Sequence, residues 1–268
     1  MKIENTEVFN FKGALFGMRN PKNSWDRSDS YLGEYGSYGV MLQKVERVSK
    51  TYKNNKAALA WLMRDGVKEK YFDDTTQKNN PLYLIYEMNL IGKKDMDLAL
   101  ALIKGGSEHR KFLRQIFVSV DITIPRYLTV EMDTYKIGTV SNSCSTMHKI
   151  TSKPFEINDF EIDDLTKEID NGYLEKQVIP HLEELRLKYL DTKDKKYWKE
   201  LIRDLPQSYL QKRTMTMNYE NLMNIYHQRK AHKLNEWSGF DNPDLTNFCA
   251  WIEELPYMGL FLGLSTLE

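Results

Sequence analysis

The sequence predicts a single domain of mixed helix and sheet, of α/β or α+β type, with a small, mostly antiparallel sheet packed by long helices. The clearest strand pattern covers residues 114–123, where isoleucine and valine side chains alternate on one face. Residues 172–194 and 218–237 instead carry apolar residues at helical spacing. With 268 residues the chain is long enough for a sizeable core. No internal repeat or linker divides it, so we expect one domain over residues 1–268.

Composition and charge limit the kinds of partner. Lys plus Arg and Asp plus Glu both number 38, so no net field attracts nucleic acid or an anionic membrane, and an anionic ligand must be bound locally. Cys144 and Cys249 show neither metal-ligand spacing nor a disulfide framework. The first residues, MKIENTEVFNF, lack the pattern of a secretory signal, and no apolar run has the length of a membrane span. We therefore expect a cytoplasmic protein.

The N-terminal residues combine a strand pattern with a long irregular segment. Residues 1–18 alternate loosely, which predicts one or two strands with Gly13 as a break. Residues 19–39 are rich in Gly, Ser, Asn, Tyr and charge. This composition predicts either a long ordered loop or a flexible flap, and its aromatic side chains suit a flat ligand.

Helical patterns occur at three places before the central strand: residues 40–50, 57–65 and 95–106. In the third helix, Asp95 is the expected N-cap and Gly105 the expected end. A polar stretch at 73–81 separates the second helix from residues 82–94, which fit a helix or a strand equally well.

A short helix and a hydroxyl-rich loop follow the central strand. Residues 124–136 fit a helix with proline in its first turn, and residues 138–148, GTVSNSCSTMH, fit a loop. Such a succession often lines a pocket, where hydroxyl and backbone N–H groups hold phosphate, although a run of Ser and Thr is also ordinary loop chemistry. Cys144, four residues before His148, is either a nucleophile or a buried, inert thiol.

The C-terminal half is mostly helical. After an acidic segment at 155–165 we expect helices at 172–194, kinked at Pro180, and at 194–206. Three further features follow: the helix at 218–237, a helix at 242–256 capped by Asn242, and the apolar stretch 258–264, read as a buried final strand or a subunit contact.

The helix predicted at 218–237 carries the strongest sign of ligand binding. Asn218 and Arg229 are eleven positions apart, which places them on nearly the same helix face. Neutral amides crowd the neighbouring positions, and a guanidinium is well matched to phosphate. The helix therefore either reads a ligand or exposes a solvated polar face.

Standard catalytic motifs are absent from the sequence. It contains no G-x-G-x-x-G, Walker A, H-E-x-x-H or G-x-S-x-G motif. Among five histidines, only His227 and His232 approach metal-ligand spacing, and five positions put them on different helix faces. We expect no metal site.

Residues 201–237, LIRDLP…RTMTMNYENLMNIYHQRKAHKLNEW, resemble the C-terminal half of the flavin-dependent thymidylate synthases. The family has an Arg near a Leu-Pro, a Thr-x-Asn helix start, a second Asn, an Arg and a Gln-Trp-Glu type ending. These are matched by Arg203, Asn218, Asn224, Arg229 and Glu236-Trp237. Residues 114–147 are similar to the family's central segment, so the resemblance covers about half the chain. DTYKIGTVSNSCSTMH and WIEELPY resemble a divergent branch encoded by phages of Gram-positive bacteria, which implies the cytoplasm of a bacterial host.

The resemblance implies a set of ligand-binding residues. As nucleotide ligands it implies Arg229, Arg203, Glu131 and Ser145, the last within a Ser-x-Arg motif of the family. As residues that bind FAD it implies Asn218, Asn224 and Lys136. The nucleotide is a pyrimidine deoxynucleotide such as deoxyuridine monophosphate, dUMP.

The sequence departs from the family at its charged motifs. The family's Arg-His-Arg falls at Thr134-Tyr135-Lys136, and its Ser-x-Arg falls near Cys144-Ser145-Thr146. Each lost charged hydrogen bond is worth about 1.5–3 kcal/mol, so FAD binding is expected to be weak or absent. The candidates to replace the lost cations are Lys136, Arg126, Arg19 and Arg213.

Two classes of function follow from the resemblance. In the first, an enzyme transfers a one-carbon unit and a hydride to dUMP, with reduced flavin as carrier. In the second, the fold is kept without catalysis, as a nucleotide-binding, inhibitory or scaffold protein of phage origin. The family assembles as a homotetramer, and with 12 methionines and 12% aromatic residues this chain has the apolar composition for a homo-oligomer.

Overall fold

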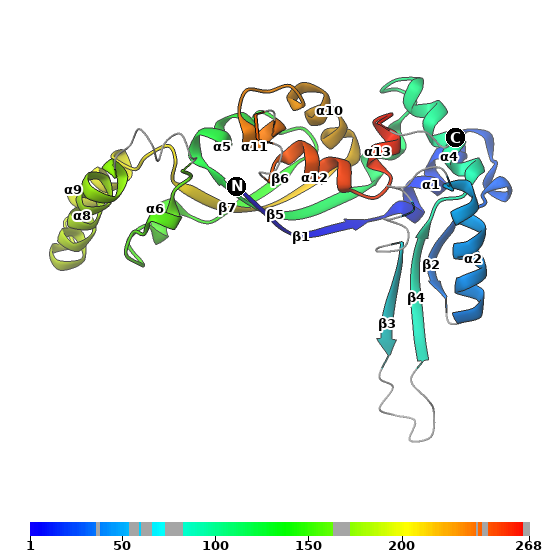
Figure 1. Ribbon diagram of the computed structural model, residues 1–268, viewed down its shortest axis with the longest axis horizontal. Coiled ribbons are helices and arrows are strands. Elements are labelled where there is room, and N and C mark those ends of the chain that lie inside the picture. The colour runs from blue at the N-terminus through cyan, green and yellow to red at the C-terminus, as the bar shows by residue number, and fades with distance from the viewer. Residues whose placement is uncertain are drawn as a thin grey trace, which may run out of the picture. The chain divides into compact units, whose positions relative to one another are not determined.

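The computed structural model of the chain describes residues 1–35, 38–53, 59, 66–72, 83–162, 172–239, 241–242 and 246–264 (Figure 1). Two compact units divide the chain. The first unit contains residues 1–6 and 119–216, and the second contains residues 7–118 and 217–268. That the whole chain acts as one domain stays a prediction.

Two small sheets confirm the predicted fold class. One sheet has the strand order β1-β5-β7-β6, and the other has the order β2-β4-β3. The strands are β1 (Lys2–Phe9), β2 (Tyr31–Tyr35), β3 (Val67–Phe72), β4 (Tyr83–Leu90), β5 (Phe117–Pro125), β6 (Val140–Ser143) and β7 (Leu210–Asn218). Strands β2 and β3 both pair antiparallel with β4, and β6 pairs antiparallel with β7.

The central strand and the helix after it are confirmed with shorter bounds. Strand β5 begins at Phe117, because Lys111–Gln115 form the 3-10 helix η3. Along β5, alternate side chains are buried, as expected for a strand with one face on a core. Pro125 is the N-cap of α5 (Arg126–Met132). Its fixed φ suits the start of a helix.

The segment predicted as a loop at 138–148 contains regular structure, so that prediction was wrong. Residues Val140–Ser143 form β6, which lies at the edge of its sheet beside β7. Residues Thr146–Lys149 form the one-turn helix α6. Strand β7 itself occupies a segment for which the sequence pattern predicts no element.

Helices α8 (Ile179–Thr192) and α9 (Lys195–Arg203) lie side by side in the first unit (Figure 1), and both contribute residues to an apolar cluster. The kink predicted at Pro180 is a π-helical turn, η5 (Leu174–Val178), directly before α8. Proline removes a backbone donor and is tolerated in the first turn of the new helix. The cluster contains Ile150, Phe155, Phe160, Leu174, Leu182, Leu185, Leu201 and Leu205.

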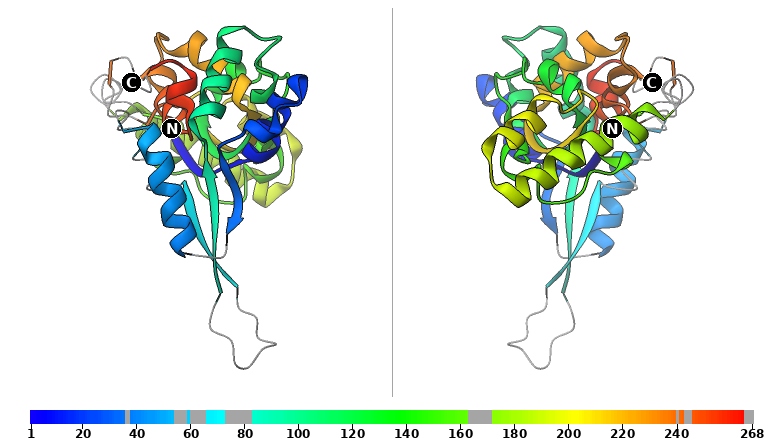
Figure 2. Two further views of the ribbon diagram at one scale, coloured as in Figure 1. Left: turned by 90° about the vertical axis from the view of Figure 1, so that its right-hand side faces the viewer. Right: turned by 90° about the vertical axis from the view of Figure 1, so that its left-hand side faces the viewer.

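In the second unit, α2 (Tyr38–Thr51) lies beside the three-stranded sheet (Figures 1 and 2). This helix confirms the prediction at 40–50, and β4 shows that residues 83–90 are a strand. Residues 19–39, predicted as a long loop or flap, contain the 3-10 helices η1 (Asn20–Lys22) and η2 (Trp25–Arg27) as well as β2. The predictions at 57–65 and 73–81 lie, apart from residue 59, outside the described residues.

Of the one or two strands predicted in residues 1–18, one is present, and the break predicted at Gly13 was wrong. Strand β1 ends at Phe9, and Phe11–Arg19 form helix α1 with Gly13 inside it. The break is at Asn10, whose φ of 71° is left-handed. The buried residues Phe11, Ala14, Leu15 and Met18 recur at helical spacing, so packing on one face favours the helix.

Helix α4 (Lys93–Lys104) ends at Gly105 as predicted, but Asp95 is not its N-cap. Gly92 holds that position, and Asp95 is fully buried in the first turn. Its carboxylate accepts hydrogen bonds from Arg19 Nε at 2.5 Å and from the hydroxyls of Ser28 and Ser30. Through these hydrogen bonds Asp95 connects α1 and residues 28–30 to α4.

The C-terminal helices are shorter than predicted. They are α10 (Tyr219–Arg229), α11 (Asn235–Ser238), α12 (Phe248–Glu254) and α13 (Met258–Phe261). The predicted helix 218–237 is therefore two helices. Asn247, and not Asn242, caps α12 by accepting the backbone N–H of Ala250 at 2.8 Å. The apolar stretch at 258–264 is buried in part but is helical and not a strand.

Candidate ligand-binding site

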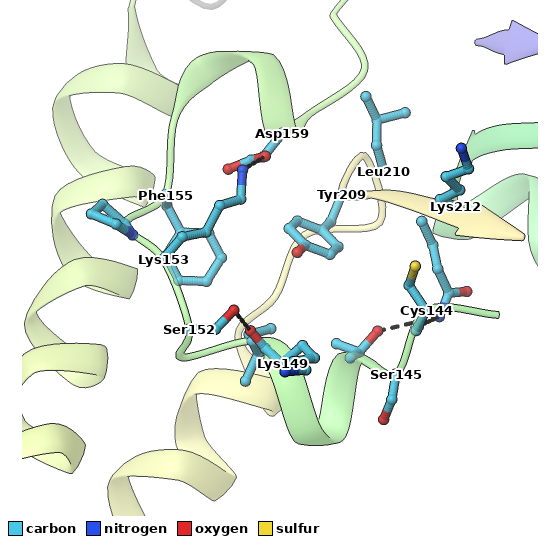
Figure 3. Close-up of a pocket in the computed structure, with 14 residues that line it drawn as sticks. Cys144, Ser145, Lys149, Ser152, Lys153, Phe155, Asp159, Tyr209, Leu210 and Lys212 are labelled. Atoms are coloured by element: carbon cyan, nitrogen blue, oxygen red, sulfur yellow. Dashed lines mark hydrogen bonds and ion pairs between the residues drawn. The ribbon is translucent and has the colours of Figure 1, made fainter.

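A pocket of about 150 Å³ lies in the first unit (Figure 3). Three parts of the chain line it: residues 144–146, residues between 149 and 159, and residues 209–212. Of the strand, short helix and hydroxyl-rich segment expected to line a pocket, only the hydroxyl-rich segment does so, at residues 144–146; no residue of β5 or α5 belongs to the lining. Small-molecule pockets commonly measure about 300–1,000 Å³, so this one fits a phosphate group or a single ring.

Hydrogen bonds fix the hydroxyl-rich wall to strand β7. The backbone N–H of Cys144 donates to the carbonyl of Lys212 at 2.9 Å, and Gln211 Nε2 donates to the carbonyl of Cys144 at 2.9 Å. Ser145 caps α6, since its Oγ accepts the backbone N–H of His148 at 3.2 Å. This Oγ also lies 2.7 Å from His148 Nδ1. The wall is therefore held in place before any ligand arrives.

The pocket has a positive lining. Lys149, Lys153 and Lys212 line it together with one carboxylate, that of Asp159. Lys153 pairs with Asp159 at 2.5 Å, and Lys212 pairs with Asp121 at 2.9 Å. Within the described part of the chain, Lys149 forms no ion pair. Its ammonium group is therefore the cation most available to an anion.

Aromatic side chains form the apolar wall. Tyr209 packs against Phe155 and Phe160, with ring centroids 6.1 and 5.7 Å apart. Burial, followed by the charge of Asp159, raises the pKa of Tyr209. Its hydroxyl therefore stays protonated at neutral pH and can donate a hydrogen bond.

Thr214, Asn5 and Lys212 hold the carboxylate of Asp121 in place. Thr214 Oγ1 donates to it at 2.6 Å and Asn5 Nδ2 at 3.0 Å. These hydrogen bonds, with that of Lys212, lower the pKa of Asp121 to about 2. Asp121 is therefore ionised at neutral pH and keeps Lys212 at the pocket wall.

A second polar cluster surrounds the start of α10 in the second unit. Glu220 accepts from Arg110 Nε at 3.0 Å and from Arg114 Nε. Arg110 also donates from Nη2 to the side-chain oxygen of Asn224 at 3.1 Å. Because a guanidinium only donates, this contact assigns the oxygen and nitrogen of the Asn224 carboxamide. The NH₂ group of Asn224, an exposed residue, therefore stays available to donate a hydrogen bond.

The two other predicted residues of this unit have structural contacts. Asn218 is the N-cap of α10, where its Oδ1 accepts the backbone N–H of Asn221 at 2.9 Å and its own N–H donates to Asn221 Oδ1. Arg229 is the last residue of α10, with its guanidinium 5.2 Å from the centroid of the buried Trp237 ring. Asn218 and Arg229 therefore stand at the two ends of one continuous helix. Their predicted spacing of eleven positions falls within that helix, and only its continuation to residue 237 was wrong.

The structure separates the predicted site residues between the two units. Glu131, Lys136, Ser145 and Arg203 belong to the first unit, and Asn218, Asn224 and Arg229 belong to the second. Only Ser145 lines the pocket. Lys136 is exposed, and Arg203 is exposed and pairs with Glu200 at 2.6 Å. The assignment of all seven residues to a ligand stays a prediction.

Two of the expected replacement cations are engaged elsewhere. Arg19 is buried against Asp95, and Arg213 donates from Nη1 to Asp133 at 2.6 Å. The residues that sequence reasoning missed are Lys149 and Lys153, which follow the hydroxyl-rich segment at short intervals. Their spacing after that segment was the available signal.

The residues assigned to FAD do not fit a tightly held flavin. The Asn218 carboxamide oxygen is used in the helix cap, and Lys136 is the one cation in the triplet 134–136. A tightly bound diphosphate needs several charged donors.

The two cysteines differ in exposure. Cys249 is buried, and burial, followed by the charge of Glu253, raises its pKa to about 12, so it is an inert thiol. Cys144 is exposed at the pocket, so the alternative that it is buried and inert was wrong.

Across the described residues, no cluster of His, Cys, Asp or Glu has the composition of a metal site. No helix in that part of the chain combines the length and apolarity needed to cross a bilayer.

Comparison with solved structures identifies the fold as that of the flavin-dependent thymidylate synthases. Two structures of ThyX from Helicobacter pylori, each with FAD and dUMP, match 98% of this chain and 97% of that chain. Both have a TM-score of 0.55 and 14% sequence identity to this chain. No family model and no curated protein matches it. At this identity the likeness establishes the fold and leaves the activity to be tested.

Proposed function

We propose that this chain is a nucleotide-binding protein with the fold of the flavin-dependent thymidylate synthases, and that it binds a pyrimidine deoxynucleoside monophosphate such as dUMP. The observation that carries the proposal is the position of residues 144–146. By resemblance they replace the Ser-x-Arg motif that holds the substrate, and they line the lysine-rich pocket. The likeness to a protein solved with FAD and dUMP supports the same ligand class.

In this proposal the pocket receives the phosphate group. Lys149 supplies the first charged hydrogen bond, while Ser145 and the protonated hydroxyl of Tyr209 offer neutral donors. The pocket volume of about 150 Å³ suits the phosphate and leaves the base and sugar outside it. In this site Lys149, three residues after the segment 144–146, takes the place of the Arg in the family's Ser-x-Arg motif.

Two functions, one catalytic and one without catalysis, are compatible with such a site. The flavin-dependent transfer of a one-carbon unit to dUMP requires a flavin, and the engagement of Asn218 in the helix cap argues against tight flavin binding. The catalytically inactive alternative, a nucleotide-binding, inhibitory or scaffold protein, requires only the phosphate site. We therefore favour nucleotide binding as the primary function. Formation of a 5-methyl product from dUMP with reduced FAD and a one-carbon donor would establish the enzyme.

Calorimetric titration of dUMP into wild-type protein and Lys149→Gln tests the proposal. Because Lys149 is exposed, its removal is expected to preserve the fold, and loss of one charged hydrogen bond predicts about a tenfold weaker affinity. The matched control is Lys188→Gln, which removes an exposed lysine paired with Glu184 on α8. Equal affinity in wild type and Lys149→Gln would contradict the proposed phosphate site.

A further inference from the structure

The ion pair between Lys153 and Asp159 lies inside the pocket and not beside it. Both residues line the pocket, and Figure 3 shows the ammonium group in contact with the carboxylate at one end of it. The Lys153 Nζ to Asp159 Oδ1 distance is 2.5 Å. This hydrogen bond is the main cause of a raised Lys153 pKa. The carboxylate thus occupies a cation that an anionic ligand would also contact.

Backbone contacts fix the carboxylate of Asp159. Its Oδ2 accepts the backbone N–H of Glu156 at 3.0 Å, and its own N–H donates to the Glu156 carbonyl at 2.9 Å. Asp159 is the last residue of the 3-10 turn η4 (Ile157–Asp159). Its side chain is 16% exposed, whereas that of Lys153 is 59% exposed. The lysine can therefore turn toward a ligand while the carboxylate stays in place.

The charges of the lining select among anions. Lys212 is neutralised by Asp121, so Lys149 and Lys153 are the two lining cations with which a ligand can pair, and Asp159 holds one of them. A phosphomonoester carries about −1.5 to −2 charge at pH 7. A monoanion brings half that charge and meets the same repulsion from Asp159. Only the stronger anion is matched to the lining.

We propose that Asp159 is a specificity-determining residue of the pocket, because its carboxylate competes with the anionic group of the ligand for Lys153. A dianionic phosphate displaces the carboxylate from Lys153, and a monoanion such as acetate does not. This inference rests on the proposed function only for placing a phosphate in the pocket. The alternative is an ordinary surface ion pair, which contributes about 0–1 kcal/mol to folding and has no effect on anions.

The test compares Asp159→Asn with wild type. Asparagine keeps an acceptor oxygen for the Glu156 N–H, so the 3-10 turn is retained. Calorimetric titrations use inorganic phosphate, sodium acetate and dUMP. The matched control is Asp97→Asn, which breaks an exposed ion pair with Lys93 in the second unit. Thermal unfolding of both variants checks that the fold is intact.

Removal of the competing charge is expected to tighten phosphate binding about five- to tenfold. Acetate binding is expected to become measurable in Asp159→Asn alone, and Asp97→Asn is expected to match wild type. Phosphate affinity that is unchanged or weaker in Asp159→Asn overturns the inference.

The dUMP titration separates this inference from the proposed function. If phosphate binds more tightly to Asp159→Asn and dUMP binds neither protein, the inference stands and the proposed function fails. If dUMP binds both proteins equally, the proposed function stands and the inference fails. If no anion binds either protein, both fail.

Discussion

Arg110 donates a 3.1 Å hydrogen bond from Nη2 to the side-chain oxygen of Asn224, and the same guanidinium is held through Nε by Glu220. Glu220 therefore orients Asn224 indirectly, at a position where the side chain is exposed. Because Arg110 donates to the oxygen, the NH₂ group of Asn224 is the part of the carboxamide that stays available as a donor. This arrangement suits a ligand that offers a hydrogen-bond acceptor.

Glu220→Gln is expected to destabilise the protein. The Glu220 side chain is 10% exposed and neutralises the guanidinium groups of Arg110 and Arg114, so its loss leaves two cations side by side. Breaking a paired charge of this burial predicts a decrease of about 2–3 kcal/mol in the free energy of unfolding, measured with urea. Glu200→Gln, in the exposed pair with Arg203, is the control and is expected to cost at most about 1 kcal/mol.

The free energy of unfolding is expected to depend on pH differently in wild type and in Glu220→Gln. Burial alone raises the pKa of Glu220, but the hydrogen bonds from Arg114 and Arg110 outweigh burial, so its pKa is lowered from 4.5. A folded-state pKa below the unfolded value contributes stability above the unfolded pKa, and that stability is lost as the pH falls through the folded pKa. Wild type is therefore expected to lose more unfolding free energy than Glu220→Gln below pH 4.5. Parallel curves for the two proteins would contradict the pairing.

Arg229→Lys tests the assignment of the nucleotide phosphate to Arg229, which the family resemblance implies, against its assignment to the pocket. If Arg229 holds the phosphate, dUMP binding is expected to weaken by about 1.5–3 kcal/mol, because lysine keeps the charge and loses the bidentate fork; if the pocket holds it, the affinity is expected to stay unchanged. The melting temperature is expected to change little, since an ammonium group also interacts with the face of the Trp237 indole ring. Calorimetry and thermal unfolding check the two parts separately. Arg47→Lys, on α2, is the control. A loss of melting temperature without a change in affinity would make Arg229 a structural residue.

Flavin affinity is expected to be micromolar or weaker, about −8 kcal/mol or less favourable. The reason is the single cation, Lys136, at residues 134–136 and the use of the Asn218 side chain in the helix cap. Absorption spectroscopy of the purified protein, followed by titration with FAD, checks this. Stoichiometric flavin in the purified protein would show that other residues form the site, and would favour the synthase reaction.

A homo-oligomer is expected in solution. Val130, Ile137 and Val140 are exposed in the first unit, and Ile137 is 90% exposed. A contiguous exposed apolar patch marks an interface, and we expect these three residues, which lie within eleven positions of the chain, to contribute to one. Light scattering is expected to give a multiple of 31.6 kDa for wild type, and a smaller assembly for Ile137→Asp. The monomer mass across a wide concentration range would refute this expectation.

Periodicity predicted the elements that a single apolar face determines. The central strand and α2 were found because burial repeats along them at strand or helix spacing. Helix α1 was missed because a loose alternation was weighed above the spacing of Phe11, Leu15 and Met18. The end of α10 at Arg229 carries no Gly or Pro signal. The contact between the Arg229 guanidinium and the Trp237 ring, which lies beyond this helix end, joins residues that the sequence pattern placed on one helix.

The site was predicted only where its chemistry is unusual for a surface. The hydroxyl-rich segment around Ser145 was predicted from its composition, and it lines the pocket. Lys149 and Lys153 were not predicted as site residues, since lysine is common on any protein surface. Asp159 was counted within an acidic segment, and only the structure shows that it pairs with a lysine of the pocket.

The central claim is that the pocket binds the phosphate of a pyrimidine deoxynucleotide. The most direct measurement is calorimetric titration of dUMP and of deoxyuridine into wild-type protein under the same salt conditions. Loss of one charged hydrogen bond costs about 1.5–3 kcal/mol, so deoxyuridine is expected to bind at least about tenfold more weakly than dUMP. Equal binding of the two compounds, or no binding of dUMP, would contradict the claim.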